Sequence, residues 1–173
     1  MAQLLWSLGY AEQRSQEALA LAQQLEYPPS LVHTQFYAAV LVQFRRDVAT
    51  AFARADALMA FATAQGLGRC VTHGRHLWGW ALAMQGDAAA GVTQLRQGLA
   101  VQEVVGPKTG RSYFLALLAE ASSQAAQPET GLTVLADACP LVAETEARWW
   151  EATLYRLREE LLCQLPLEVI QKL

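Results

Sequence analysis

Hydrophobic side chains recur at spacings of three and four residues along most of the chain, which is the period of an amphipathic α-helix. The clearest stretch runs from His76 to Leu99, where two such segments flank a turn at Gln85-Gly86-Asp87. Gly79 and Gly91 lie on either side of this turn. Because glycine has no side chain, two helix backbones can approach closely there, and the pattern predicts a helical hairpin. Larger side chains are expected to fill its seam: Trp78, Leu82 and Leu95.

The hairpin pattern repeats along the chain. Small residues near the end of each second helix follow one another at steps of 39, 41 and 40 residues: Ala18, Ala57, Gly98 and Ala138. The first helices carry a small residue 19 positions before the matching small residue of the second: Ala38, Gly79 and Ala119. A regular step of this size is typical of repeat proteins, in which each hairpin buries its apolar face against its neighbours.

The order of bulky and small residues in each hairpin resembles the tetratricopeptide repeat. A small residue between two bulky ones on the first helix faces a small-bulky-small run on the second, here Gly91, Leu95 and Gly98. The step exceeds the roughly 34 residues of a standard repeat, so we expect longer helices. The sequence therefore predicts an all-α fold: an α-solenoid of antiparallel helical hairpins, with long tetratricopeptide-like repeats of about 40 residues each in a right-handed superhelix.

Five stretches carry a narrower resemblance: GWALAMQGD, QLRQGLA, YFLALLAEA, QPETGL and WEATLYRLREELL. They are similar to the carboxy-terminal tetratricopeptide-like region of large bacterial signalling proteins that join a nucleotide cyclase-like domain, an ATPase module and these repeats. The resemblance covers nearly all of the chain and implies a regulatory or assembly surface. The sequence contains no cyclase motif and no G-x-x-x-x-G-K-[ST] phosphate-binding loop, so it does not imply the chemistry of the larger proteins.

We expect one repeat domain over residues 1–173. Its parts are a truncated repeat, three full repeats, and an unpaired helix with a tail: residues 1–27, 28–66, 67–106, 107–146 and 147–173. The expected helices after the truncated repeat cover residues 29–44, 47–65, 68–84, 87–104, 111–126, 128–144 and 147–164.

Two places depart from regular helical repeats. Gly9 is interpreted as a turn, and it lies nine residues before its small position, against twelve in the central hairpin. The loss of about three residues, less than one helical turn, predicts an irregular or displaced amino-terminal segment. Pro140 falls inside a second helix, where it removes the hydrogen bond to the carbonyl of Ala136 and predicts a kink.

Composition narrows the possible partners and locations. Hydrophobic residues make up 53% of the chain, enough for a continuous core. A formal net charge of −3 without a Lys/Arg block argues against a nucleic-acid or anionic-membrane partner. No apolar run is long enough to span a membrane, and the amino terminus lacks a signal-peptide pattern, so we expect a soluble cytoplasmic protein. Cys70, Cys139 and Cys163 fit no disulfide framework or zinc spacing and are expected to be reduced, partly buried thiols.

Candidate catalytic or metal-binding groups are few. Cys70, His73 and His76 follow one another at three-residue spacing, which could seat a metal ion on one helical face. No H-E-x-x-H motif or further ligand accompanies them, so we favour groove or packing roles. The carboxylate pairs Glu144/Glu146 and Glu159/Glu160 are interpreted as solvated charges. The sequence thus predicts a non-enzyme without cofactor or metal.

Two functions stay open. The first is a protein-protein interaction or regulatory scaffold that holds a peptide or a partner helix in a concave groove formed by the first helices. The second is a small-molecule effector-sensing module with an apolar groove around Trp80 and Tyr113. Both fail in this form if Trp80 and Tyr113 lie in the interhelix core. The groove is predicted from the repeat register: Val32, Gln35, His73, His76, Trp80, Tyr113, Glu120, Arg156 and Glu160.

The last helix predicts self-association. It has no second helix to cover it, and Glu159 occupies its small position. Exposed apolar side chains on this helix would be hidden in a two-fold homodimer through residues 147–173. The predicted interface consists of Trp149, Trp150, Leu154, Leu157 and Leu161. The alternative is that a further repeat covers this helix in a longer chain.

Overall fold

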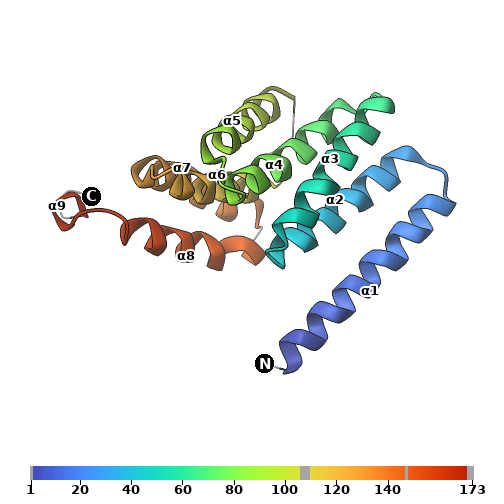
Figure 1. Ribbon diagram of the computed structural model, residues 1–173, viewed down its shortest axis with the longest axis horizontal. Helices are drawn as coiled ribbons and strands as arrows, with labels where there is room; N and C mark the ends of the chain where they lie inside the picture. Colours follow the sequence, from blue (N-terminus) through green and yellow to red (C-terminus); the bar gives the residue numbers. More distant parts are fainter. Residues whose placement is uncertain (1, 106–109, 147, 171–173) are drawn as a thin grey trace. The chain divides into compact units, whose positions relative to one another are not determined.

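The computed structural model describes residues 2–105, 110–146 and 148–170. These residues form helices joined by short turns, and no strand occurs among them, so the all-α fold class is confirmed. Figure 1 shows the helices: α1 (Ala2–Gln24), α2 (Pro28–Phe44), α3 (Val48–Ala64), α4 (Gly68–Met84), α5 (Ala88–Val105), α6 (Arg111–Gln124), α7 (Pro128–Thr145), η1 (Arg148–Trp150), α8 (Glu151–Leu162) and α9 (Leu167–Ile170). The sequence placed each boundary from α2 to α7 within two residues.

The turns give the repeat its period. At the end of α3, Gly66 adopts a left-handed φ of 69°, its amide bonds to the carbonyl of Thr63, and the amide of Leu67 bonds to the carbonyl of Ala62. This is a Schellman motif, which satisfies the last carbonyls of a helix. The same pair of bonds closes four helices, at left-handed Arg46, Gly66, Gly86 and Ala126. Further left-handed residues at Glu26 and Glu146 keep the 20-residue step, so one helix and its turn take 20 residues.

The hairpin step is therefore 40 residues between the described turns, which corrects the predicted steps of 39 and 41. Leu58 is buried and stands 40 residues before Gly98, whereas Ala57 is exposed. The equivalent first-helix position is Ala39, which is fully buried and 40 residues before Gly79. Neighbouring alanines at 38 and 39 made the sequence register ambiguous by one residue.

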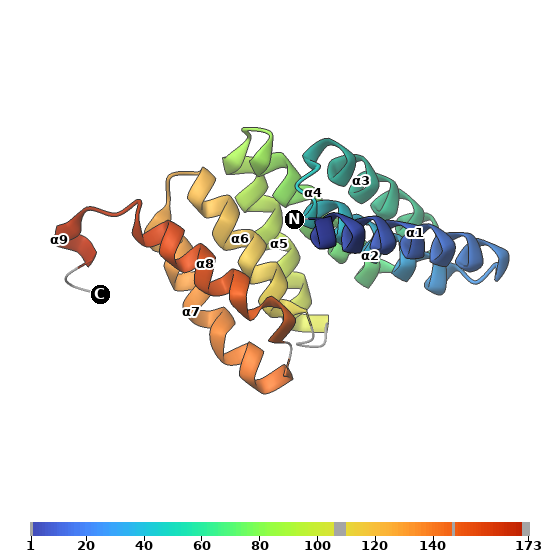
Figure 2. The same cartoon turned by 90° about the horizontal axis from the view of Figure 1, so that it is seen from below.

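The chain forms two compact units, Met1–Trp78 and Gly79–Leu173, each with its own packing. In the first unit α1 packs on α2 and α2 on α3 (Figure 2). The start of α4 packs on α3 at Gly74, where an added Cβ would lie 2.6 Å from Met59 Cγ. The rings of Phe52 and Trp78 contact each other nearby, with centroids 5.5 Å apart.

In the second unit α5 packs on α6, and α8 lies against both α6 and α7 (Figure 2). The end of α4 crosses α5 at the two glycines that the sequence singled out: a Cβ on Gly91 would lie 2.5 Å from the carbonyl oxygen of Gly79. Forty residues on, Gly131 faces the side chain of Leu161 and the carbonyl of Ala119. The predicted close approach of helix backbones is thus present in this unit.

The amino-terminal prediction was wrong. α1 is one helix from Ala2 to Gln24, and Gly9 lies inside it. Apart from the backbone of α1 itself, no atom of the described residues lies within 4 Å of the position that a Cβ on Gly9 would occupy, so no packing demand explains this glycine. A lone glycine in a helix costs about 1 kcal/mol, which is too little to end a helix of this length.

Helix α7 continues past Pro140 to Thr145. Pro140 and Ala136 are both exposed, so the carbonyl that Pro140 cannot bond lies on the solvent-facing side of the helix. Water can satisfy a carbonyl there, which lowers the cost of an internal proline. A bend at Pro140 stays a prediction.

Candidate functional site

Five of the predicted groove residues are buried. Val32, His76, Trp80 and Tyr113 have exposed fractions of 1%, 0%, 0% and 3%, and Glu120 has one of 8%. Their side chains form part of the core between helices and present no surface to a ligand. The prediction that Trp80 and Tyr113 line an open groove was therefore wrong, and the apolar groove of the effector-sensing alternative has no basis at these residues.

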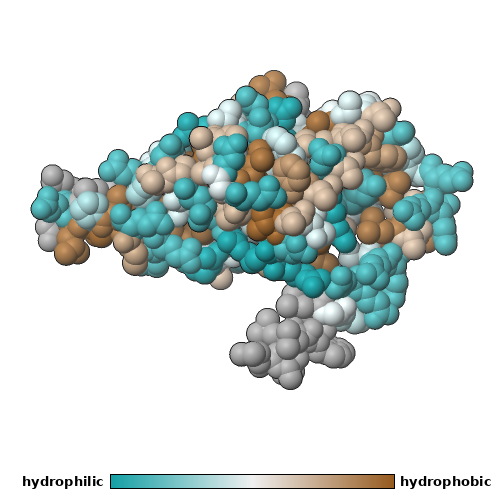
Figure 3. Space-filling model, in the orientation of Figure 1, coloured by the Kyte–Doolittle hydropathy of each residue, from teal (hydrophilic) through white to brown (hydrophobic). Residues whose placement is uncertain are grey.

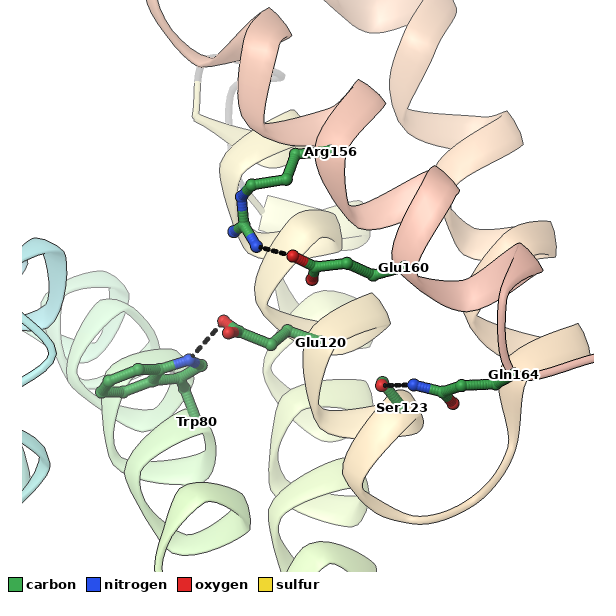
Figure 4. A network of polar contacts seen from close by, with 6 residues as sticks. All are labelled: Trp80, Glu120, Ser123, Arg156, Glu160 and Gln164. Carbon is green, nitrogen blue, oxygen red and sulfur yellow. Dashed lines mark hydrogen bonds and ion pairs between the residues drawn. The ribbon is translucent and has the colours of Figure 1, made fainter.

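The buried aromatic side chains of the second unit are held by polar and ring contacts. Trp80 Nε1 donates a hydrogen bond to Glu120 Oε2 at 2.7 Å, between α4 and α6 (Figure 4). The ring of Tyr113 meets Trp150 edge-on, with centroids 4.7 Å apart. Burial, and next the negative charge of Glu120, raise the pKa of the Tyr113 phenol well above its usual value. These residues fix the packing of α4, α6 and η1.

The exposed predicted groove residues of this unit lie on α8. Arg156 donates to Glu160 at 2.5 Å, and both side chains are about half exposed. Figure 4 shows this pair on the side of α8 that faces α6, with Glu120 nearby. One turn further on, Gln164 donates to the hydroxyl of Ser123 at 2.6 Å. The second of these contacts ties the residues just after α8 to the end of α6.

In the first unit, the exposed face of α2 carries an aromatic pair. His33 and Tyr37 are one helical turn apart, their rings meet edge-on with centroids 4.9 Å apart, and Tyr37 is 56% exposed. On the inner side of the same helix, the ring of Phe36 packs against the ring of His73 of α4, with centroids 5.0 Å apart. The predicted groove residues Gln35 and His73 are half-buried beside them.

A cleft of about 620 Å³ opens beside this aromatic pair, where α2 and α4 begin. Its lining comes from two segments 40 residues apart: Tyr27, Pro29, Ser30, His33 and Thr34, and Leu67, Gly68, Arg69 and Cys70. Sequence reasoning missed this cleft, although the 40-residue step could have paired the two segments. No carboxylate belongs to this lining.

The pKa of His73, one turn into α4, responds to the charges near the cleft. Burial, and next the charges of Arg69 and His33, lower the pKa of His73 from 6.5 to about 4. Arg69 of α4 and His33 of α2 therefore both lie within electrostatic range of His73. His73 is neutral near pH 7, so no proton would compete with a metal ion for its ring nitrogens. The described residues, however, contain no group of three or more His, Cys, Asp or Glu that could hold a metal ion.

A second, more apolar groove of about 470 Å³ lies between α7 and α8 in the second unit. Leu132 and Cys139 line it from α7, Tyr155 and Leu162 from α8, and Ile170 from α9. Cys139 and Cys163 are exposed and Cys70 is half-buried, so only Cys70 matches the partly buried thiols that the sequence predicted.

The predicted dimer interface is also buried in the chain's own fold. Trp150, Leu154, Leu157 and Leu161 are at most 4% exposed, because they form the inner face of η1 and α8 against α6 and α7. The side chain of Trp149 lies outside the described residues. Over α8, the visible face in Figure 3 is mainly hydrophilic. These four residues are already covered within the chain, so they do not form the exposed apolar strip that the predicted dimer would hide, and that prediction was wrong.

Within the described part of the chain, no helix has both the length and the apolar character that a membrane span requires.

Comparison with known proteins identifies solved structures with a similar fold. No family model matches the chain, and no curated protein matches it in sequence. A crystal structure of nearly identical TPR-like repeats from a kinesin light chain-like protein of Podosopora anserina superposes with a TM-score of 0.57, at 18% identity over 94% of this chain and 87% of that one. A single-residue variant of those repeats gives the same TM-score at 16% identity, over 94% and 88%. The chain thus has the fold of TPR-like repeats, an α-solenoid of helical hairpins.

Proposed function

We propose that this chain is a non-catalytic scaffold that binds a peptide or a partner helix on the exposed face of its first helices. The TPR-like fold supports a protein-interaction role in general. The observation that carries the proposal is the exposed His33–Tyr37 pair beside the cleft at the start of α2 and α4. Large aromatic side chains at the edge of a cleft are typical anchors for a protein partner.

The binding face differs from the one that the sequence predicted. Trp80 and Tyr113 stabilise the core, and the surface beside His73 and Gln35 takes their place. Tyr37 offers an apolar ring with a polar tip, and the neighbouring cleft offers depth for a second side chain. Such a pair of features suits a short peptide with two anchors better than a flat protein surface. A cytoplasmic signalling or assembly role, as the resemblance implies, belongs to this proposal.

A library of random peptides displayed on phage and selected on the intact chain tests the proposal. Selected peptides should lose at least tenfold in affinity for Tyr37→Ala. They should bind Tyr155→Ala normally, since Tyr155 is equally exposed, at 55%, but lies on α8. Failure to select any peptide, or equal losses in both variants, would overturn the proposed binding face.

Self-association is a separate proposal and uses other side chains than those predicted. The apolar groove between α7 and α8 leaves Tyr155 exposed and Leu132 and Leu162 partly exposed, and two copies could cover it around a two-fold axis. Light scattering at micromolar concentration should give twice the chain mass, and Leu132→Glu should return the chain to a monomer. A monomer of the unmodified chain at that concentration contradicts the proposal.

A further inference from the structure

We propose that the cleft between the first turns of α2 and α4 binds an anionic group, a carboxylate or a phosphate, carried by a larger molecule. This inference rests on the proposed function for its setting, because it names the chemistry that the binding face recognises. It is carried by the cleft's position in the fold, by the arginine and the lack of carboxylates in its lining, and by its size.

The lining carries the guanidinium of Arg69 and no carboxylate. Arg69 is exposed at the start of α4, and His33 is exposed one turn into α2. Both line the cleft, and none of the residues that line it with them is acidic. Burial is the largest cause of the lowered pKa of His73, and Arg69 and then His33 add to it, so both side chains lie within electrostatic range of His73. The Arg69 guanidinium attracts an anion that enters the cleft.

Backbone and hydroxyl groups add to this preference. The cleft faces the first turns of two helices of 17 residues each. Pro28 and Pro29 give α2 no free amide there, so the positive helix end that favours an anion is that of α4. The first amides of a helix have no acceptor within the helix, and in α4 these belong to Gly68 and Arg69. Ser30 adds a hydroxyl at the mouth of the cleft, while the hydroxyl of Thr34 donates to the carbonyl of Ser30 at 2.8 Å.

The volume indicates that the ligand is larger than an inorganic ion. The cleft measures about 620 Å³, and one water molecule occupies about 30 Å³ of liquid. Tyr27, Pro29 and Leu67 form an apolar wall next to the cationic groups. The ligand therefore has an organic body against this wall and an anionic end near Arg69. A peptide with a terminal or side-chain carboxylate and a small phosphorylated metabolite share this chemistry.

The first experiment uses inorganic phosphate and acetate as probes. The amide signals of the intact, nitrogen-15-labelled chain are followed by NMR at constant ionic strength, with sodium chloride as the reference salt. We expect saturable shifts at Gly68, Arg69 and Cys70 with phosphate or acetate, and no matching shifts with chloride. Arg69→Gln should weaken the binding at least tenfold, and Arg69→Lys should restore part of it. Arg96→Gln, which removes an exposed arginine from α5, should leave the binding unchanged.

The outcome of this titration decides the inference. Shifts spread evenly over exposed basic residues, or equal loss in the Arg69→Gln and Arg96→Gln variants, would overturn it. Arg69 is exposed, so Arg69→Gln should fold normally, which circular dichroism verifies. Stabilisation of the unmodified chain by phosphate in thermal unfolding, absent in Arg69→Gln, gives a second readout that does not depend on signal assignment.

The peptides selected on the chain distinguish the two possible sources of the anion, a peptide and a small molecule. If they bind and lose at least tenfold in affinity when the carboxylate is amidated, the anion belongs to a peptide. If phosphate binds in an Arg69-dependent way and no peptide is selected, the ligand is a small anionic molecule; the inference then stands and the proposed function fails. If peptides bind equally well to Arg69→Gln and phosphate does not bind, the inference fails and the proposed function stands.

Discussion

The crossing of α4 and α5 at Gly91 allows a sharp test of the packing. An added methyl group at this position would lie 2.5 Å from the carbonyl oxygen of Gly79, and 2.7 Å and 2.8 Å from Cβ and N of Ala83. Favourable contacts between carbon atoms need about 3.5–4.0 Å. All three of these atoms belong to the backbone or to a Cβ of α4, so no side chain can rotate away, and the helices must separate by about 1 Å to restore such contacts.

The expected cost follows from two opposing terms. Overpacking in a core costs about 1–3 kcal/mol, and the rigid neighbours favour the upper half of that range. Alanine is the better helix former and returns about 0.5–1 kcal/mol. Gly91→Ala should therefore lower the free energy of unfolding by about 1–2.5 kcal/mol. At about 2–4 °C per kcal/mol for a chain of this size, Tm should fall by about 2–10 °C.

Two matched variants make the test specific. Gly9→Ala places the same methyl group in α1, where no atom lies within 4 Å, so only the helix-forming gain remains and stability should rise by up to about 1 kcal/mol. Gly74→Ala meets the flexible Met59 Cγ at 2.6 Å and should fall between the two. Urea unfolding followed by circular dichroism measures all three. If Gly91→Ala is as stable as Gly9→Ala, the close helix crossing does not exist.

Three further predictions follow from the turns, the histidine and the core. Ala126→Gly should raise the free energy of unfolding by about 0.5–1 kcal/mol, because the exposed left-handed position suits glycine. Gly86→Ala should lower it by a similar amount. Equal stability of the two variants and the unmodified chain in urea would contradict the role of the Schellman turns. Because the pKa of His73 is lowered from 6.5 to about 4, the unfolded chain takes up a proton below pH 6.5 that the folded chain refuses, and stability should fall by about 1.4 kcal/mol per pH unit between these values; His73→Phe should remove this part of the acid sensitivity, and parallel pH profiles of the two proteins would refute it. Trp80→Phe leaves the buried Glu120 carboxylate without the indole donor and should lower the free energy of unfolding in urea by about 1.5–3 kcal/mol. The affinity for peptides at the first unit should stay unchanged. A loss of peptide affinity at unchanged stability would show that Trp80 belongs to the binding face after all.

Local sequence signals were sufficient wherever the neighbours along the chain decide the structure. The turn at Gly86 was predicted from the sequence, and its glycine has a positive φ of 106°. Pro28 and Pro128 begin α2 and α7, because proline fits the first turn of a helix and cannot continue the one before it. The same reasoning failed at Gly9, where no second signal supported a turn.

Which side of each helix faces solvent could not be predicted as well. Moving the register by one residue along a helix rotates the chosen face by about 100°, and the neighbouring alanines at 38 and 39 left that choice open. In α4 the register at Gly79 was right, yet the predicted groove residues His76 and Trp80 are fully buried, because helices distant in sequence cover that face. Likewise, Leu154 and Leu161 looked uncovered in sequence because no second helix follows α8, yet α6 and α7 already cover them.

The sequence by itself determined the repeat of helical hairpins, because helix periodicity, turn glycines and first-turn prolines act within a few residues of the chain. Only the tertiary structure decided which side chains remain accessible, because burial depends on helices that are distant in sequence. Arg69 and His33 are 36 residues apart and share one cleft, while the indole of Trp80 reaches across 40 residues to Glu120. Function at the surface is set by such juxtapositions, which no local pattern encodes.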